Sequence, residues 1–276
     1  MALDSPISKI EFKKTRRKMS RIVSVHSFRG GTGKSNITAN LASLIALHDY
    51  RVAVFDTDIQ SPGIHVPFGL DAHNMGQTLN EFLRAECEIE KVAFSIGEHP
   101  GEAPGRQQLV GKSLWLVPSS INSSEISQVL RDGYDVSRLN EGMQALLRKL
   151  NLDYLFIDTH PGLNEETLLS IAISDILIIL LRPDQQDFQG TAVTVDIARG
   201  LDVPHLFLVV NKALERYDFD QIKKKVQDTY QAQVAGVLPL TEDLADIGSA
   251  DIFSLRDPFH PWSKGLQQIA QLIQDI

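Results

Sequence analysis

The sequence predicts an α/β protein in which a mainly parallel, doubly wound sheet lies between two layers of helices, a three-layer α/β/α architecture. Short apolar runs of strand length alternate along the chain with longer segments that carry apolar residues at helical spacing. Parallel strands are joined by crossovers of about a dozen residues or more, usually helices, so this alternation favours a parallel sheet. The first apolar run, 22–26, also leads through a glycine-rich turn into a helical segment, 37–47.

Composition restricts the class of protein. The chain has 276 residues, of which 43% are apolar, enough for one domain, residues 21–276, with a substantial core. No apolar run approaches the roughly 18 residues of a transmembrane helix, and no apolar stretch of the signal-peptide type follows the basic N-terminus. The single cysteine, Cys87, cannot form an internal disulfide. We therefore expect a cytoplasmic protein.

A basic arm, residues 1–20, precedes the predicted domain. Residues 1–21 carry seven Lys or Arg against two acidic residues, although the whole chain has a net charge of −8. The arm fits an electrostatic anchor to DNA or anionic lipid, a solvated and disordered tail, or a segment upstream of a true initiator at Met19. The acidic remainder argues against a broadly basic nucleic-acid-binding body.

The predicted domain begins with a phosphate-binding loop. The stretch Ser-Phe-Arg-Gly-Gly-Thr-Gly-Lys-Ser-Asn, residues 27–36, joins the first strand to the first helix. Its glycines lack Cβ atoms, so the backbone can curl round an anion, and the start of the helix adds its positive end. The Lys34 ammonium suits the β- and γ-phosphates, and the Ser35 hydroxyl is placed to ligate Mg²⁺. The expected nucleotide-binding residues here are Gly30, Gly31, Thr32, Gly33, Lys34, Ser35 and Asn36.

Two further predicted strands end in aspartates. The apolar run 52–55 is followed by Asp56-Thr57-Asp58, and the run 154–157 is followed by Asp158. Open α/β sheets bind ligands at the carboxyl ends of their strands, so these carboxylates should lie beside the loop. Carboxylates suit a hard cation, and we expect Asp158 and Asp56 to serve Mg²⁺ together with the serine of the loop. The alternative is that Asp56 and Asp58 are merely the solvated end of a strand.

The remaining elements follow the same alternation. The segment 86–111 is the hardest to assign, and we expect a surface loop with a short strand around 92–96. The other predicted elements are a short helix at 77–83, a strand at 114–118, helices at 123–130 and 136–150, a strand at 174–181, a helix at 188–199, a strand at 206–210, a helix at 218–230, a strand at 234–240 and a helix at 261–276.

Two of the later helices bear on function. The helix at 218–230 carries Lys223-Lys224-Lys225, which fits either a solvated face or a contact with DNA or another anionic surface. The final helix has apolar residues on one face and Lys264 as its only base. Membrane-surface helices are rich in Lys and Arg, so we expect this helix to dock on the core of its own domain rather than to target a membrane.

The loop and the acidic strand ends resemble those of the MinD/ParA family of P-loop ATPases. That family has a deviant Walker A loop, Lys-Gly-Gly-x-Gly-Lys-[Ser/Thr]. This chain has Arg29 at the position of the first lysine and Phe28 where the usual P-loop has a glycine. Residues 59–64 resemble the family's first switch region, and Asp-Thr-His-Pro-Gly at 158–162 resembles the second. The resemblance covers nearly all of residues 21–276.

The resemblance implies a switch cycle. ATP and Mg²⁺ bind, two subunits close face to face over two nucleotides, and a surface for DNA, a membrane or a protein partner appears. Hydrolysis then reopens the homodimer, commonly when a partner protein stimulates it. The resemblance also implies roles for three side chains: Asp58 orients the attacking water, Arg29 reaches the partner's nucleotide, and Asn211, which follows the strand at 206–210, binds the adenine edge.

Several assignments remain open from the sequence alone. His160 fits a pH-sensing or basic role, or a polar residue of the switch loop without a catalytic role. Asn211 equally fits a turn after a strand, and Lys149 is an alternative to Arg29 across the dimer. The whole chain also fits a nucleotide-binding adaptor with negligible turnover, or a metabolic P-loop enzyme in which a nucleotide phosphate activates a small acid.

Overall fold

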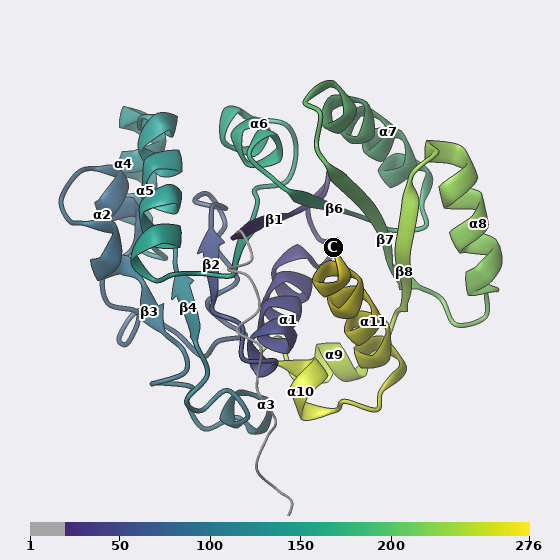
Figure 1. Ribbon diagram of the computed structural model, residues 1–276, viewed down its shortest axis with the longest axis horizontal. Coiled ribbons are helices and arrows are strands. Elements are labelled where there is room, and N and C mark those ends of the chain that lie inside the picture. The colour runs from purple at the N-terminus through teal and green to yellow at the C-terminus, as the bar shows by residue number, and fades with distance from the viewer. Residues whose placement is uncertain (1–19) are drawn as a thin grey trace, which may run out of the picture.

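The computed structural model describes residues 20–276, so the expected basic arm lies outside the described residues except for Ser20. The strands are β1 (Arg21–His26), β2 (Val52–Asp56), β3 (Phe94–Ser95), β4 (Leu114–Val117), β5 (Tyr154–Asp158), β6 (Ile176–Leu181), β7 (His205–Ala213) and β8 (Gln233–Pro239). They form one sheet in the order β3-β4-β2-β5-β1-β6-β7-β8 (Figure 1). Neighbouring strands are parallel except for the antiparallel pair β3 and β4.

Helices cover both faces of this sheet (Figure 1). They are α1 (Lys34–Leu47), α2 (Leu79–Leu83), α3 (Pro104–Gln107), α4 (Ser123–Asp132), α5 (Val136–Lys149), α6 (Glu165–Ala172), α7 (Gln185–Gly200), α8 (Phe219–Tyr230), α9 (Asp243–Asp246), α10 (Phe253–Arg256) and α11 (Pro261–Asp275). Helices α1, α10 and α11 pack on one face, and α2, α5, α7 and α8 pack on the other. This arrangement confirms the predicted three-layer, doubly wound α/β/α fold.

The central strands are buried on both faces because their side chains alternate between two cores. In β1, Val23 and Val25 lie in the core under α1 and α11, whereas Ile22 lies in the core under α5. Ile37 and Leu41 of α1 are fully buried in the first of these cores. Strand β1 has β5 on one side and β6 on the other, so the loop that follows it leaves the middle of the sheet. That is the position at which open α/β sheets bind ligands.

The structure contains four short helices that the sequence pattern did not predict: α3, α6, α9 and α10. Three have four residues and α6 has eight, too few to show a helical period of apolar positions. Helix α6 begins where the Asn164 side chain accepts a hydrogen bond from the Thr167 N–H at 2.8 Å. The strand predicted around 92–96 is only the two residues of β3, after a 3₁₀ turn at Ile89–Val92.

The predicted end of the strand at 206–210 is also wrong. Strand β7 continues through Asn211 and Lys212 to Ala213, and its register with β8 shifts between Val210 and Ala213. Lys212 has a φ of 60°, in the left-handed region that residues other than glycine rarely adopt. An irregularity of this kind bends a strand and turns its side chains toward new neighbours, which a simple alternating pattern does not predict.

The last helix, α11, docks on the domain as expected. Its apolar face, with Trp262, Leu266, Ile269 and Ile273, is buried in the core shared with α1. The docking prediction is therefore confirmed. None of the helices in residues 20–276 is both long and apolar enough to cross a lipid bilayer.

Candidate functional site

The loop between β1 and α1 has the backbone that an anion-binding turn requires. Gly31 and Gly33 have φ values of 76° and 97°, which favour glycine. A Cβ atom on Gly33 would also lie 2.7 Å from the Asn211 Nδ2 atom, so two constraints meet at this position. The Thr32 hydroxyl donates to the Ser27 Oγ atom at 2.9 Å and braces the turn from within. Within the described chain, no backbone carbonyl accepts from the N–H groups of residues 30–35, which leaves them available to an anion.

Three carboxylates gather beside this loop, as predicted. Asp56 at the end of β2 and Asp158 at the end of β5 are register partners, and Asp58 follows two residues later. Asp56 and Asp158 are almost completely buried, and Lys34 and Asp58 are only 7% and 8% exposed. The Oδ2 atoms of Asp56 and Asp158 are buried without a hydrogen-bond partner. Buried oxygens are rarely left without partners, so these atoms point to a ligand.

The electrostatics of this cluster favour an added cation. Burial raises the pKa of Asp158 to about 6, although a hydrogen bond from Ser35 and the charge of Lys34 act in the opposite direction. Burial and the charges of Asp158 and Asp58 raise the pKa of Asp56 well above its usual value. Burial also lowers the pKa of Lys34, although the charges of the three carboxylates act to raise it. One buried ammonium therefore faces three carboxyl groups, and a divalent cation would balance the excess negative charge.

A pH dependence of stability follows from the buried Asp158 carboxyl. Its pKa rises from a usual value of 3.8 to about 6, so the folded chain binds this proton more tightly than the unfolded chain does. The resulting stabilisation is complete below the usual pKa and is lost as the pH rises through 6. The shift corresponds to about 3 kcal/mol.

We compare the free energies of unfolding of the wild type and Asp158→Asn without Mg²⁺. Between about pH 4 and about pH 7.5 the difference should move against the wild type by most of this amount. Adding Mg²⁺ at the upper pH should restore the wild type more than the variant. Parallel stability curves for the two proteins would contradict the assignment.

Asp58 contacts a residue that the sequence alone did not connect to it. The Asp58 Oδ1 atom lies 2.6 Å from the His160 Nδ1 atom. The same oxygen accepts hydrogen bonds from the Ser61 N–H at 3.2 Å and the Ser61 hydroxyl at 3.1 Å. The loops after β2 and β5 therefore meet on one carboxylate oxygen at the edge of the phosphate-binding loop.

The two variant residues of the loop lie against helix α7. The Arg29 guanidinium is hydrogen-bonded to Gln186 and lies 3.7 Å from the Asp187 carboxylate, and its side chain is 40% exposed. A Cβ atom on Gly190 would lie 2.1 Å from the Phe28 ring, so this glycine makes room for the phenylalanine. Lys149, the alternative to Arg29, forms an ion pair with Glu90. Lys149 is the last residue of α5 and lies shortly before the amino end of β5, whereas the loop follows the carboxyl end of β1.

The irregular end of β7 supports the loop from the other side. The Asn211 Nδ2 atom donates to the Thr32 carbonyl at 2.8 Å, and the Lys212 ammonium donates to the Gly31 carbonyl at 2.8 Å. The Trp262 Nε1–H donates to the Asn211 Oδ1 atom at 3.4 Å. Adenine binding by Asn211 therefore stays a prediction, while its contact with the loop is a structural fact. Lys212 is a residue of the site that the sequence did not predict, because no pattern in the sequence indicates its positive φ.

Comparison with known proteins identifies the family. The family model of the CobQ/CobB/MinD/ParA nucleotide binding domain matches residues 23–252. The chain belongs to this family. The sequence-based resemblance to MinD/ParA proteins is thereby confirmed.

Relatives within the family have names that refer to different roles. A flagellum site-determining protein of Helicobacter pylori is 27% identical over 192 residues, which are 70% of this chain and 58% of that protein. An iron-sulfur cluster carrier protein of Methanococcus maripaludis is 29% identical over 218 residues, which are 74% of this chain and 61% of that protein. This chain therefore spans less than two thirds of the length of either relative.

A solved structure shows the shared fold. The septum site-determining protein MinD of Pyrococcus horikoshii, in complex with Mg-ADP, has a TM-score of 0.74 to this chain at 18% sequence identity. The alignment covers 92% of this chain and 96% of that one. At this level of identity the likeness concerns the fold alone.

The close packing of the Phe28 ring against Gly190 of α7 can be tested by substitution. Gly190→Ala should lower the free energy of unfolding by about 1–3 kcal/mol, because the added methyl group overlaps the Phe28 ring. Gly200→Ala in the same helix is the matched control, since no atom lies within 4 Å of the place that its new methyl group would occupy, and it should be neutral or slightly stabilising.

Chemical denaturation of the two variants measures this difference. The double variant Phe28→Ala/Gly190→Ala should lose less stability than the sum of the two single changes, because the two positions share one space. Equal effects of alanine at Gly190 and Gly200, or full additivity with Phe28→Ala, would contradict the proposed fit.

A buried histidine, His26, ends β1 just before the loop that leads to α1. The His26 Nδ1 atom lies 2.8 Å from the Thr159 hydroxyl oxygen. Burial, with smaller effects of Lys34 and His160, lowers the pKa of His26 to about 3, so its ring is neutral at ordinary pH. Its Nε2 atom is buried without a partner. In the sequence, His26 is distinguished only as the end of an apolar run of strand length.

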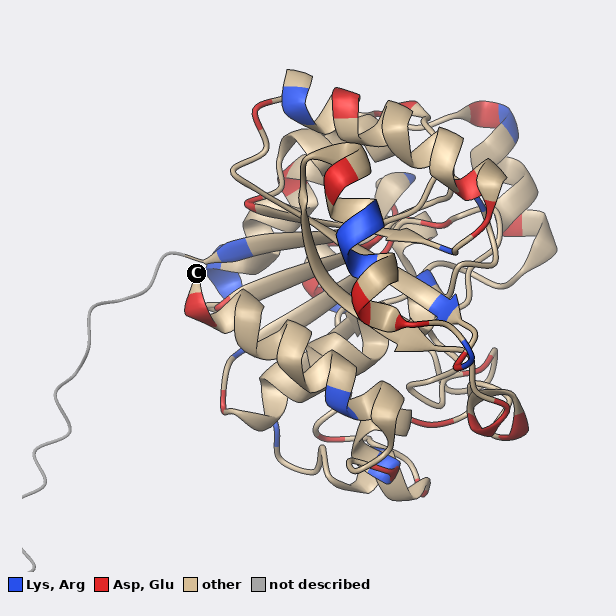
Figure 2. Ribbon diagram, turned by 90° about the vertical axis from the view of Figure 1, so that its right-hand side faces the viewer, with Lys and Arg blue, Asp and Glu red and all other residues tan. Residues whose placement is uncertain are grey.

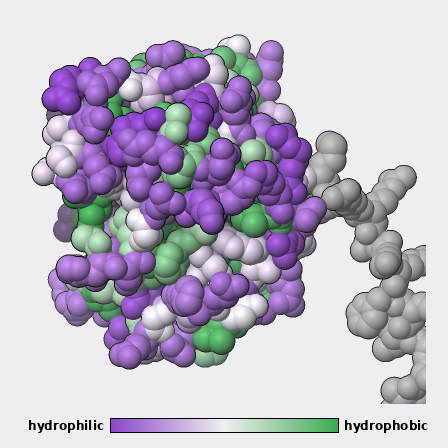
Figure 3. All heavy atoms as spheres, turned by 90° about the vertical axis from the view of Figure 1, so that its left-hand side faces the viewer, coloured by the Kyte–Doolittle hydropathy of each residue, from purple (hydrophilic) through white to green (hydrophobic). Residues whose placement is uncertain are grey.

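Two outer faces differ in character. Figure 2 shows the face with α8 in front, where the exposed residues Lys223, Lys224 and Lys225 form a basic stretch. Figure 3 shows the opposite face, which is mostly hydrophilic with smaller hydrophobic areas between the polar side chains. Leu130 of α4 is 53% exposed, but single exposed apolar residues are ordinary on protein surfaces.

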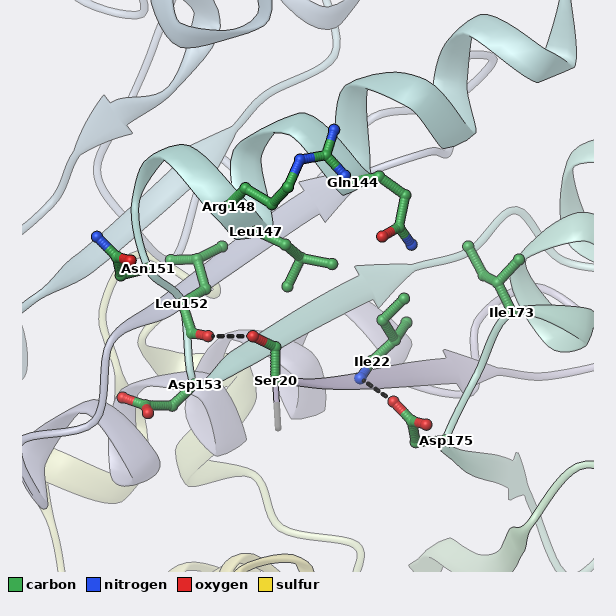
Figure 4. Close-up of a pocket in the computed structure, with 10 residues that line it drawn as sticks. All are labelled: Ser20, Ile22, Gln144, Leu147, Arg148, Asn151, Leu152, Asp153, Ile173 and Asp175. Atoms are coloured by element: carbon green, nitrogen blue, oxygen red, sulfur yellow. Dashed lines mark hydrogen bonds between the residues drawn. The ribbon is translucent and has the colours of Figure 1, made fainter. Parts of the chain in front are cut away.

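A cavity of about 570 Å³ lies away from the nucleotide-binding loop, at the amino ends of β1 and β5 (Figure 4). Two of its polar lining groups have partners within the fold. The Asp175 carboxylate accepts from the Ile22 N–H at 2.8 Å, and the Ser20 hydroxyl donates to the Leu152 carbonyl at 2.7 Å (Figure 4). These contacts tie the start of β1 to the segments that precede β5 and β6.

Proposed function

We propose that this chain is an ATP-hydrolysing positioning or partitioning ATPase of the MinD/ParA type, which forms a homodimer with ATP and Mg²⁺ and changes its affinity for a surface or partner after hydrolysis. The observation that carries the proposal is the cluster of Lys34 and three buried carboxyl groups beside a loop with unpaired N–H groups. Such a cluster suits a polyphosphate together with a divalent cation.

The residues of the site fit the nucleotide and the metal. The loop N–H groups and the Lys34 ammonium would bind the β- and γ-phosphates, and Ser35, Asp158 and Asp56 would hold Mg²⁺ directly or through water. The unpaired Oδ2 atoms of both aspartates support this assignment. When bound, Mg²⁺ neutralises charge that develops on the phosphates. Asp58, at the mouth of the cluster, would accept a hydrogen bond from the attacking water and so orient it.

Arg29 is the proposed contact to the partner's nucleotide. It lies next to the phosphate-binding loop, keeps a positive charge and can bind a phosphate with two N–H groups. In the single chain its guanidinium is held by Gln186 and Asp187, so it must leave them to act in a dimer. The same contact favours a second candidate function, a nucleotide-binding adaptor whose Arg29 stays on its own chain and whose turnover is negligible.

The proposed cycle requires a part of the protein that binds another molecule or a membrane. The exposed lysines of α8 form such a candidate patch. Lys223, Lys224 and Lys225 suit DNA or another anionic surface, whereas α11 is committed to the core (Figure 2). Cluster transport, the role in the name of one relative, is not proposed, because the sequence holds a single cysteine and iron–sulfur clusters require several. Stimulation by a partner protein is part of the proposal.

Phosphate release from ATP, compared with and without Mg²⁺ and with Lys34→Met as the inactive control, tests the ATPase activity. Pelleting with anionic liposomes and mobility shifts with nonspecific DNA, each with ATP or ADP and at two salt concentrations, test the surface. The proposal expects Mg²⁺-dependent hydrolysis and binding that depends on the nucleotide. Nucleotide binding without any hydrolysis would leave the adaptor as the better account.

A further inference from the structure

The Asp58 carboxylate is held by one of its two oxygens. The Oδ1 atom receives three contacts, two from Ser61 and one from His160 at 2.6 Å. Among the described residues, nothing donates to the Oδ2 atom of the same group. The second oxygen of this carboxylate is therefore free to accept a hydrogen bond from water.

We propose that His160 is a positioning residue, which donates its Nδ1–H to the Asp58 Oδ1 atom and thereby turns Oδ2 toward the attacking water. This inference rests on the proposed ATPase function, because it assigns to His160 a part in the water attack. It goes beyond that function by naming His160 as the group that holds the Asp58 carboxylate in the orientation needed to bind the water.

The protein holds the histidine itself in place. His160 precedes Pro161, and a residue before proline is restricted to extended backbone conformations. The Thr167 hydroxyl of α6 lies 3.4 Å from the His160 carbonyl oxygen. The ring also lines a cavity of about 20 Å³, with Tyr134, Asn164 and Glu166, which has room for about one water molecule.

The chemistry of the pair determines the tautomer. An ionised carboxylate only accepts hydrogen bonds, so the contact requires the hydrogen to be on the His160 Nδ1 atom. A side-chain amide can reproduce this donor. In asparagine the Nδ2 atom occupies about the position of the imidazole Nδ1, whereas in glutamine the donor reaches the position of Nε2. Comparing asparagine with glutamine at position 160 therefore distinguishes a specific hydrogen bond to Asp58 from a general need for a polar side chain.

The experiment compares His160→Asn, His160→Gln and Asp58→Asn in the full chain, with His73→Gln as a control on an exposed histidine. We expect kcat for ATP hydrolysis to fall about 10–100-fold in His160→Gln and to stay within about threefold of the wild type in His160→Asn. The dissociation constant for MgATP should be unchanged in both. Adding His160→Gln to Asp58→Asn should cause no further loss, because the two residues act as one unit.

A second measurement does not depend on turnover. Long-range ¹H–¹⁵N spectra of the imidazole rings should show His160 with its hydrogen on Nδ1 in the nucleotide-free wild type, and should show a changed tautomer population in Asp58→Ala. A wild-type ring with its hydrogen on Nε2 would overturn the inference, whatever the kinetics show.

The outcomes separate this inference from the function on which it rests. If the wild type hydrolyses ATP and His160→Gln is as active, the positioning role is wrong and the ATPase function stands. If the wild type binds MgATP and hydrolyses none, the ATPase function is wrong and the role of His160 in water attack is wrong with it.

Discussion

Asp58→Asn is expected to lower kcat for ATP hydrolysis by about 100-fold or more, while the affinity for MgATP stays within about threefold of the wild type. Asparagine keeps the size of the side chain and an oxygen for the Ser61 and His160 contacts, but it removes the negative charge that attracts and orients a water. The loss therefore falls on the chemical step and not on binding.

Single-turnover phosphate release measures the chemical step, and titration with a fluorescent ATP analogue measures binding. Asp71→Asn, on an exposed turn, is the matched control and should be as active as the wild type. A variant of Asp58 that loses nucleotide affinity and kcat together would show that this carboxylate supports the fold of the site and not the reaction.

Lys34→Met is expected to weaken MgATP binding by about 100-fold. Methionine fills a similar space without the charge, and charge-assisted hydrogen bonds of the kind that Lys34 would make to phosphate contribute about 1.5–3 kcal/mol each. The change also removes an ammonium that, among residues 20–276, alone faces the carboxylates of Asp56, Asp58 and Asp158. The metal-free variant should therefore be less stable than the wild type at neutral pH.

Lys212→Met is the matched control for this prediction. Lys212 is exposed and donates to the Gly31 carbonyl, so its loss should weaken MgATP binding much less than the loss of Lys34. Equal losses for the two variants, measured by calorimetric titration, would contradict the assignment of Lys34 as the principal phosphate ligand.

The sequence predicted the parts of the site that are local. The loop lies between a strand and a helix, and its glycines and Lys34 act through backbone that is contiguous in the chain. Asp56 and Asp158 were also predictable, because each ends an apolar strand and parallel strands end at one edge of a sheet.

The contacts across the fold were not predictable in the same way. Asp58 and His160 are 102 positions apart, and Lys212 is 181 positions from Gly31. Which side chains meet at such separations depends on strand order, on loop geometry and on the irregular end of β7, none of which leaves a periodic pattern. Gly190 illustrates the same limit, because its role depends on the Phe28 ring packed against it.

We expect ATP, but not ADP, to close two copies of this chain over their nucleotides. Molar mass in solution, measured with each nucleotide and Mg²⁺ for the wild type, Asp58→Ala and Arg29→Ala, tests it most directly. We expect a protomer with ADP, a dimer with ATP that Asp58→Ala makes longer-lived, and no stable dimer for Arg29→Ala. The same mass with ATP and ADP, for the wild type and for Asp58→Ala, would contradict the switch and favour the adaptor or the metabolic enzyme.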